Sequence, residues 1–177
     1  SAEVYKQLKD YVYPYLSFYL YNTYNLDIED RPPITSYNFN EPSSLFNGMI
    51  NPLIPYTMKG VLWYQGENNA FRYEEYQELF SSLISDWRNK WGNEFPFYYV
   101  QIAPYFNYYN SNAPLREAQR KSLEIPKTGM VVTLDIGEKY DIHPSNKHDV
   151  GYRLARYALK NDYKIELIES GPLFKTF

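Results

Sequence analysis

Apolar side chains recur at helical spacing within the first 24 residues, where Pro14 would kink or end a helix, and in three stretches farther along, which predict three helices. The clearest stretch places one apolar stripe on a single helix face: Tyr76, Leu79, Phe80, Leu83, Ile84, Trp87 and Trp91. Gly92 suits the C-terminal cap of this helix. A second helix is predicted over residues 114–123, where Pro114 fits the first turn. Ser145 can cap a third helix. The apolar face of this third helix consists of Val150, Leu154, Tyr157 and Ala158.

Short, nearly continuous apolar runs separate these helices and predict buried strands. The runs cover residues 59–64, 96–102 and 130–134. Strands that alternate with helices indicate an α/β fold, in which a mostly parallel sheet has helices on both faces. In such folds the functional site lies beyond the carboxyl ends of the strands. We therefore expect the loops at 65–69 and 135–143, together with the loop after Ile102, to converge.

The two ends of the chain differ in character from the middle. Residues 1–42 are rich in tyrosine and proline, and we predict helical and loop structure there. The first 24 residues carry seven tyrosines, which favour either a sugar-binding platform or a packing face with hydroxyl groups in solvent. Residues 43–162 carry the strand and helix pattern. Residues 163–167 alternate apolar and charged side chains, so we predict that 163–177 begins a further, half-buried strand.

Composition narrows the function classes. The 177 residues are 44% hydrophobic and carry a net charge of -3, so a core can form and no broad basic surface for nucleic acid is expected. The chain has no cysteine, which excludes disulfides, thiolate zinc sites and cysteine nucleophiles. No apolar run approaches the roughly 18 residues of a membrane span. No signal peptide is recognisable within the chain.

His143 is the first candidate for chemistry, because the chain has only two histidines and this one follows Asp141 by two positions. A general base needs a pKa near neutrality and a partner that fixes its tautomer, and Asp141 or Asp135 could be that partner. The alternative is that His143 only pins the loop or caps the following helix. His148 lies on the exposed side of that helix and is expected to be solvated.

The second candidate is the sequence WYQGENN at residues 63–69, where a strand is predicted to turn into a helix. Gly66 would let a ligand approach the backbone. The side-chain amides of Gln65 and Asn69 could hold an oxyanion, and Glu67 could anchor the loop. A strand end followed by asparagine helix caps is the structural alternative, and the sequence does not decide between the two.

Two other chemistries involve the same acidic residues. Glu67 with Asp135 or Asp141 could form the acid and base pair of a glycosidase. Asp141, His143 and His148 are residue types that ligate metals, but the spacing of the two histidines is not that of a zinc-binding helix. We therefore expect no metal site.

Taken together, the motifs are much more specific than any one of them. In chain order they read SLFNGMI (44–50), GVLWYQGE (60–67), LREAQ (115–119), TLDIG (133–137) and DIHP (141–144). The last motif continues with Lys147, Val150-Gly151 and Arg153-Leu154-Ala155. In this order the motifs resemble the sialate O-acetylesterase family of carbohydrate esterases, within the SGNH hydrolases. The resemblance covers about residues 43–172.

The resemblance implies a three-layer α/β/α, flavodoxin-like domain. It also implies an esterase that removes O-acetyl groups from sugars by serine acyl transfer, without a cofactor. His143 would be the base that takes the serine proton. Asp141, or Asp135 if the loop folds that way, would orient the imidazole.

The resemblance also suggests roles for amide and basic side chains. Gln65 with Gly66 would help to form the oxyanion hole. Arg116 and Gln119 match family positions near the site and are carried over as supports or substrate contacts. Asn68 is a departure, since the family usually has serine there, and its bulkier amide changes the geometry of the loop.

The nucleophile is the larger departure from the family pattern. The nucleophilic serine of such enzymes lies in a Gly-rich segment near the domain start, ahead of the region that matches here. No serine of this chain directly follows a glycine, and Ser17, Ser36, Ser43 and Ser44 lack the strand-then-glycine context. We therefore expect the chain to be the C-terminal portion of an esterase domain. Its sheet would be incomplete on the N-terminal side, and the isolated chain would be inactive.

If the chain is the C-terminal portion of an esterase domain, its expected binding partners follow. They are an acetylated sugar or glycan and the missing N-terminal part of the same domain, and an exposed sheet edge predicts self-association. Neither nucleic acid nor a membrane is expected to bind. The resemblance implies a secreted or periplasmic protein. Two alternatives stay open, a noncatalytic glycan-binding or partner module and a glycosidase that uses Glu67.

Overall fold

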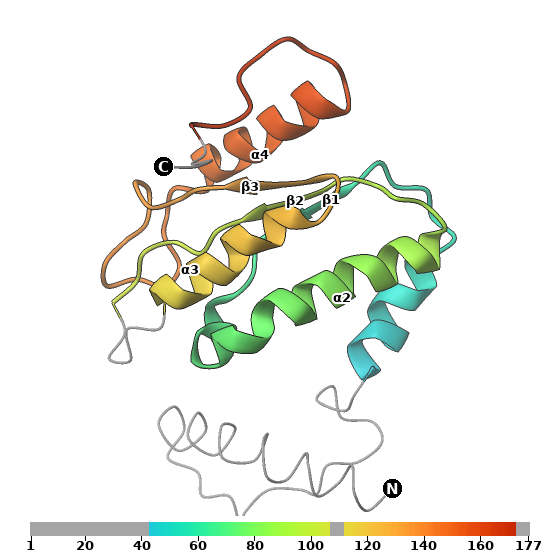
Figure 1. Ribbon diagram of the computed structural model, residues 1–177, viewed down its shortest axis with the longest axis horizontal. Coiled ribbons are helices and arrows are strands. Elements are labelled where there is room, and N and C mark those ends of the chain that lie inside the picture. The colour runs from blue at the N-terminus through green and yellow to red at the C-terminus, as the bar shows by residue number, and fades with distance from the viewer. Residues whose placement is uncertain (1–42, 107–111, 173–177) are drawn as a thin grey trace, which may run out of the picture. The chain divides into compact units, whose positions relative to one another are not determined.

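The computed structural model describes residues 43–106 and 112–172 (Figure 1). The chain divides into two compact units, Ser1–Leu53 and Ile54–Phe177. The described part of the first unit contains a short π-helix, η2 (Phe46–Ile50), and a 3-10 helix, η3 (Asn51–Leu53), and neither has a buried residue. The helix and loop structure predicted for residues 1–42 lies outside the described residues.

The second unit alternates strands and helices. In chain order its elements are β1 (Val61–Trp63), η4 (Glu67–Arg72), α2 (Tyr73–Trp91), β2 (Phe97–Val100), α3 (Asn112–Lys121), η5 (Ser122–Glu124), β3 (Thr128–Val131) and α4 (Lys147–Asn161). The three strands form a parallel sheet in the order β1-β2-β3. Figure 1 shows α2 and α3 on one face of this sheet and α4 on the other. The predicted α/β fold with helices on both faces is confirmed.

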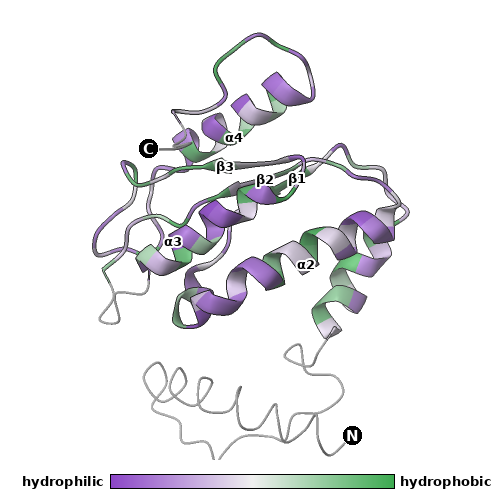
Figure 2. Ribbon diagram, viewed as in Figure 1, coloured by the Kyte–Doolittle hydropathy of each residue, from purple (hydrophilic) through white to green (hydrophobic). Residues whose placement is uncertain are grey.

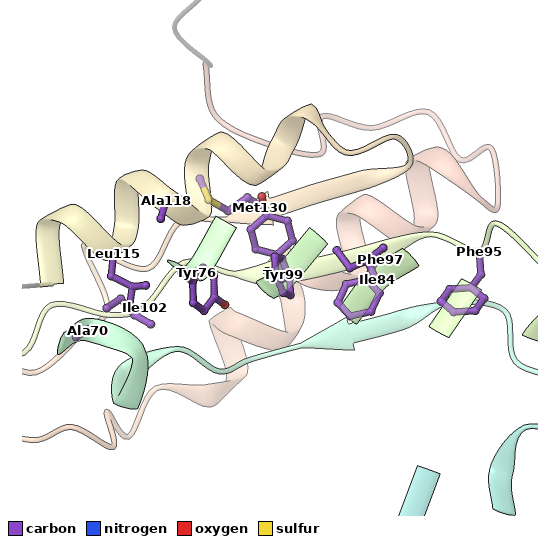
Figure 3. Packing of buried hydrophobic residues seen from close by; sticks show 11 residues of the cluster. Ala70, Tyr76, Ile84, Phe95, Phe97, Tyr99, Ile102, Leu115, Ala118 and Met130 are labelled. Atoms are coloured by element: carbon purple, nitrogen blue, oxygen red, sulfur yellow. The ribbon is translucent and has the colours of Figure 1, made fainter. Parts of the chain in front are cut away.

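The central strand β2 supplies both layers of the core, because successive side chains of a strand point to opposite faces. Phe97 and Tyr99 lie in the cluster under α2 and α3, whereas Tyr98 and Val100 lie in the cluster under α4. All four are buried, which explains why the sequence of this strand is continuously apolar rather than alternating. Figure 3 shows the first cluster, in which Tyr99 lies among side chains from both helices.

Aromatic rings fill the layer between the sheet and α2. The Phe80 ring meets the Tyr99 ring edge-on at a centroid distance of 5.0 Å and the Phe97 ring at 5.6 Å. Edge-on contacts suit the ring quadrupoles and stabilise the core by about 0.5–1.5 kcal/mol each beyond area burial. On the other face, Tyr98 stacks on Tyr157 of α4 at 5.5 Å. Gly129 makes room there, because a Cβ at that position would lie 2.5 Å from the Tyr157 ring.

The helix ends follow the sequence signals with small displacements. Gly92 closes α2 in the left-handed conformation, with φ 62°, as predicted. The N-cap of α4 is Asn146, whose side chain accepts a hydrogen bond from the Asp149 N–H at 3.1 Å, so the prediction of Ser145 was one residue early. Helix α3 is already formed at Asn112, ahead of Pro114. Figure 2 shows hydrophilic and hydrophobic residues alternating around these helices, as amphipathic surface helices require.

The half-buried strand predicted from residue 163 is not formed within residues 163–172. Lys164 has a positive φ of 59°, which interrupts an extended backbone. The Ile165 N–H donates to the Leu159 carbonyl at 3.0 Å, so the chain turns back on the end of α4 instead of pairing. The sequence alternates correctly here, but a strand also needs a neighbouring strand. Among the described residues, no helix is long and apolar enough to cross a membrane.

Candidate active site

The loop after β1 is shaped by a glycine at a crowded position. Gly66 is buried and has φ +152°, a backbone conformation that residues other than glycine rarely adopt. A Cβ there would lie 2.9 Å from the Ile102 side chain and 3.1 Å from the Gln119 amide nitrogen. Downstream, the Asn69 N–H donates to the Gly66 carbonyl at 2.8 Å, which begins η4. Gly66 is therefore required by the backbone turn itself.

Gln119 of α3 holds this loop against the neighbouring strand. Its side chain is fully buried and its Oε1 accepts the Ile102 N–H at 2.9 Å. Its Nε2 donates to the Val100 carbonyl at 3.3 Å and to the Gln65 carbonyl at 3.4 Å. Of the two roles that the sequence left for Gln119, support of the loop fits these contacts, because every side-chain group is already used.

The Gln65 amide points away from this anchor. Its Nε2 donates to Asn69 Oδ1 at 2.7 Å, while the side chain also lines a cavity. The Tyr76 hydroxyl donates to the Gln65 carbonyl at 3.3 Å, so the backbone here is held from two helices. The two predicted amide donors, Gln65 and Asn69, therefore do lie together, with Asn69 fixing the orientation of Gln65.

The loop after β3 presents His143. The His143 backbone N–H donates to Asp141 Oδ1 at 2.8 Å, which closes a tight turn around the histidine. Glu138 braces the same loop, because its Oε1 accepts from the Ser145 N–H at 2.7 Å and from the Ser145 hydroxyl at 2.8 Å. Asp141 and Glu138 thus hold an exposed imidazole at the start of α4.

His143 and the loop after β1 line one cavity of about 330 Å³. Its walls are Tyr64, Gln65, Glu67, Asn68, Ile142, His143 and Lys147. The predicted convergence of the loops at 65–69 and 135–143 is therefore observed, whereas no described residue of the loop after Ile102 lines this cavity. No serine is among these lining residues. Among the described residues that line the cavity, Glu67 is the one carboxylate, and none of them offers the acidic partner that a glycosidase requires.

Tyr64 and Lys147 are features of this cavity that the residue-level reasoning did not single out. Lys147 Nζ lies 5.1 Å from the centroid of the Tyr64 ring, a cation–π contact. Burial, together with the negative charge of Glu67, raises the pKa of the Tyr64 hydroxyl, so it stays protonated at neutral pH. Both residues belong to the motifs that carried the family resemblance, which was the available signal.

Asp135 is engaged elsewhere. Its two oxygens accept hydrogen bonds from Arg153 of α4 at 2.7 and 2.6 Å. These bonds to the guanidinium lower the pKa of Asp135 to about 2. Arg153 also donates to the Val132 carbonyl at 2.7 Å, so the pair fastens the end of β3 to α4. Asp135 is not among the residues that line the His143 cavity.

The remaining predicted side chain, Arg116, lies in a different cavity, formed by the loops after β2 and β3. His148 is on the first turn of α4 with 90% of its side chain exposed, as expected from the sequence. Within residues 43–106 and 112–172, no group of three or more histidine, aspartate or glutamate side chains could hold a metal ion.

Comparison with known proteins identifies the family. The family model described as "Carbohydrate esterase, sialic acid-specific acetylesterase" matches residues 34–160, which is more than half of the chain. The chain belongs to this family. The carbohydrate esterase match includes both walls of the His143 cavity and the cavity that contains Arg116.

Several relatives agree with this assignment. A mouse sialate O-acetylesterase is 34% identical over 166 residues, covering 74% of this chain and 31% of its own length. The human sialate O-acetylesterase is also 34% identical, over 134 residues, covering 63% of this chain and 26% of its own length. A solved carbohydrate acetylesterase from Xanthomonas citri is 44% identical, with a TM-score of 0.72, and covers 76% of this chain and 33% of that chain. The chain thus spans between about a quarter and a third of the length of these esterases.

Proposed function

We propose that this chain carries the general base and part of the oxyanion site of a carbohydrate O-acetylesterase, a serine hydrolase that removes acetyl groups from sugars. One observation carries the proposal. His143 and the loop at 65–68 line the same cavity at the carboxyl ends of the strands. Membership of the carbohydrate esterase family supports the reaction class. The names of the relatives, sialate O-acetylesterase and carbohydrate acetylesterase, support an acetylated sugar as substrate. A secreted or periplasmic location stays part of the proposal and rests on the family resemblance.

His143 acts in this mechanism as the proton carrier. It accepts the proton of the serine hydroxyl as the serine oxygen attacks the acetyl carbonyl. It then donates that proton to the departing sugar oxygen, which leaves an acetyl-serine. In the second half, His143 accepts a proton from water as the water attacks the acetyl group, and the serine recovers its proton when acetate leaves.

Asp141 is the acid that we assign to orient His143. One Asp141 oxygen is used by the His143 N–H. The other is available, among the described residues, to accept the imidazole Nδ1–H and so fix the tautomer that leaves Nε2 free. Asp135 is the weaker candidate for this role, because both of its oxygens are bound by Arg153.

The developing negative charge on the acetyl oxygen needs hydrogen-bond donors. We assign this role to the Gln65 side-chain amide and the backbone at Gly66, with Asn69 orienting Gln65. Glu67 and Asn68 complete the wall of the cavity. We assign the nucleophilic serine to a segment outside this sequence, because no serine of the chain directly follows a glycine as the family pattern requires.

The test measures acetate release from an O-acetylated sugar by the full-length protein. We expect His143→Ala to lower kcat by about a thousandfold or more, because the serine loses its base. His148→Ala is the matched control, since His148 is exposed on the same loop-to-helix segment, and it should change kcat by less than about twofold. Equal loss in both variants, or no loss in His143→Ala, would contradict the assignment.

A second, independent test uses the isolated chain. We expect no acetate release from residues 1–177 alone, because the proposal assigns the nucleophile to a segment outside this sequence. If the isolated chain releases acetate and His143→Ala abolishes that release, then a serine within the chain is the nucleophile and the division of the site proposed here is wrong.

A further inference from the structure

A second cavity lies at the same edge of the sheet as the His143 cavity. Its volume is about 360 Å³, and its walls include Tyr105, Phe106 and Arg116 from the β2 and α3 side and Gly137 and Lys139 from the loop after β3. The loop that carries Lys139 also carries His143. The two cavities are therefore neighbours along one segment of backbone.

The walls of this cavity are held in place by backbone contacts. The Phe106 N–H donates to the Lys139 carbonyl at 2.8 Å, which ties the loop after β2 to the loop after β3. Gly137 packs directly on Pro104, and a Cβ at position 137 would overlap the proline ring. On the helix side, Gln101 Nε2 donates to the Arg116 carbonyl at 3.0 Å.

The charges in this cavity are of one sign. Arg116 and Lys139 both line it, and none of the other described lining residues is a carboxylate. Within the described residues, neither cation forms an ion pair. The acids next to these cations in sequence are engaged elsewhere, since Glu138 accepts hydrogen bonds from Ser145 and Glu117 pairs with Arg120. Burial lowers the pKa of the half-buried Arg116 guanidinium, but arginine stays protonated at neutral pH.

Burying half of a cation without a counter-charge costs desolvation free energy, and binding an anion beside the cation offsets that cost. Arginine has a planar fork that matches a carboxylate, and lysine adds a second positive charge. Aromatic side chains lie beside these two cations. Phe106 lines the cavity, and the Tyr140 ring meets the Phe106 ring edge-on at a centroid distance of 6.4 Å. Lys139 Nζ lies 5.0 Å from the centroid of the Tyr140 ring. Cations next to aromatic faces suit a sugar that carries an acid group.

We propose that this cavity binds the carboxylate of an acidic sugar unit in the acetylated substrate, through Arg116 and Lys139. The inference rests on the proposed function and makes these two residues specificity determinants of it. Residues 139 and 143 are four positions apart, so their Cα atoms lie at most about 14 Å from one another. An acidic sugar whose carboxylate is held at Lys139 can therefore place its own acetyl ester, or that of the adjoining sugar, at His143.

The experiment compares two substrates that differ only in charge. They are O-acetylated sialic acid and the methyl ester of the same sugar, which lacks the carboxylate. In the full-length protein we expect Arg116→Gln and Lys139→Gln to raise KM for the acid by about tenfold. KM for the methyl ester should change by less than about twofold, and kcat should be unchanged for both. Lys121→Gln, at the other end of α3, is the control and should change neither KM.

A binding measurement separates failure of this inference from failure of the proposed function. Deacetylated sialic acid is titrated into the full-length protein and its dissociation constant is measured by NMR, with no catalysis involved. Weaker binding in Arg116→Gln and in the exposed Lys139→Gln supports the carboxylate site even if no acetate release is found. If acetate is released but both variants treat acid and methyl ester alike in KM and in binding, the carboxylate site is refuted and the esterase assignment stands.

Discussion

At the scale of single residues, the site depends on side chains that hold other side chains. Asn69 orients the Gln65 amide, and Gln119 holds the Gln65 carbonyl. Asp141 closes the turn that presents His143. Such positioning is needed because catalytic donors and bases act only within hydrogen-bond reach of the reacting atoms.

The two candidate acids can be separated by one pair of substitutions. In the full-length protein we expect Asp141→Asn to lower kcat for acetate release by about a hundredfold or more, since the amide cannot stabilise the charged imidazole. Asp135→Asn should lower kcat by less than about threefold, because Asp135 is bound to Arg153. Steady-state kinetics on an acetylated sugar measures both. The reverse ranking would make Asp135 the orienting acid.

Replacing Gly66 is expected to destabilise the fold. Gly66→Ala forces a side chain into φ +152° and against Ile102, so we expect a loss of about 1–3 kcal/mol in the free energy of unfolding. Gly151→Ala is the contrasting control. Gly151 lies inside α4 with open space around it, so alanine should stabilise by about 0.4–1 kcal/mol. Urea unfolding of the two variants checks both signs, and a neutral Gly66→Ala would contradict this account of the loop.

At the scale of elements, α4 is fixed at its first turns by polar contacts. Asn146 caps its N-terminus, and Arg153 joins it to the end of β3 through Asp135. Because the His143 loop runs from β3 into α4, these contacts also define the two ends of that loop. The position of the base therefore depends on how α4 docks on the sheet.

The Asp135–Arg153 pair predicts a dependence of stability on pH. The pKa of Asp135 falls from its ordinary 3.8 to about 2 in the folded protein. A lowered pKa means that the folded state favours the charged carboxylate, so the contribution is present above about pH 4 and is lost as the pH falls toward 2. We expect the difference in unfolding free energy between wild type and Asp135→Asn to shrink over that interval.

Urea unfolding between pH 6 and pH 2 measures this difference. Glu166→Gln, which removes an exposed carboxylate beyond the end of α4, serves as the control for the general effect of losing an acid. A difference between wild type and Asp135→Asn that stays constant from pH 5 to pH 2 would show that the pair does not stabilise the fold.

At the scale of the second unit, the two faces of the sheet are covered unequally. Helices α2 and α3 cover one face, while α4 packs on β2 and β3. Leu62 of β1 is 59% exposed, and β1 stands at an edge of the described sheet. An open edge with an apolar side chain favours pairing with another chain.

We expect the isolated chain to self-associate through this edge. Light scattering after size-exclusion chromatography should give an average mass that rises with concentration. Leu62→Lys, which places a charge on the edge strand, should shift the average mass toward that of one chain. Glu166→Lys controls for added positive charge elsewhere. A mass of one chain at every concentration for the wild type would refute the prediction.

The sequence by itself determined the elements with strong local signals. The stripe from Tyr76 to Trp91 and Gly92 defined α2, because helical periodicity and a left-handed cap are local properties. The apolar runs indicated three strands, but the predicted burial of β1 was wrong for Leu62, which is 59% exposed. Strand β3 covers Thr128–Val131 and not 130–134. Ordered motifs also indicated the family that the comparisons confirmed. All of these depend on residues close in sequence or on their order.

Only the tertiary structure decided which groups share a cavity and which are already used. Asp135 and Asp141 look equivalent in the sequence, but Arg153, 18 residues beyond Asp135, binds one of them. Arg116 and Gln119 lie three residues apart, yet one lines a cavity and the other is fully buried. The strand predicted at 163–167 had the right alternation but turned back on α4 instead of pairing. In each case the outcome depends on a distant partner, and its position is set by packing that no local pattern contains.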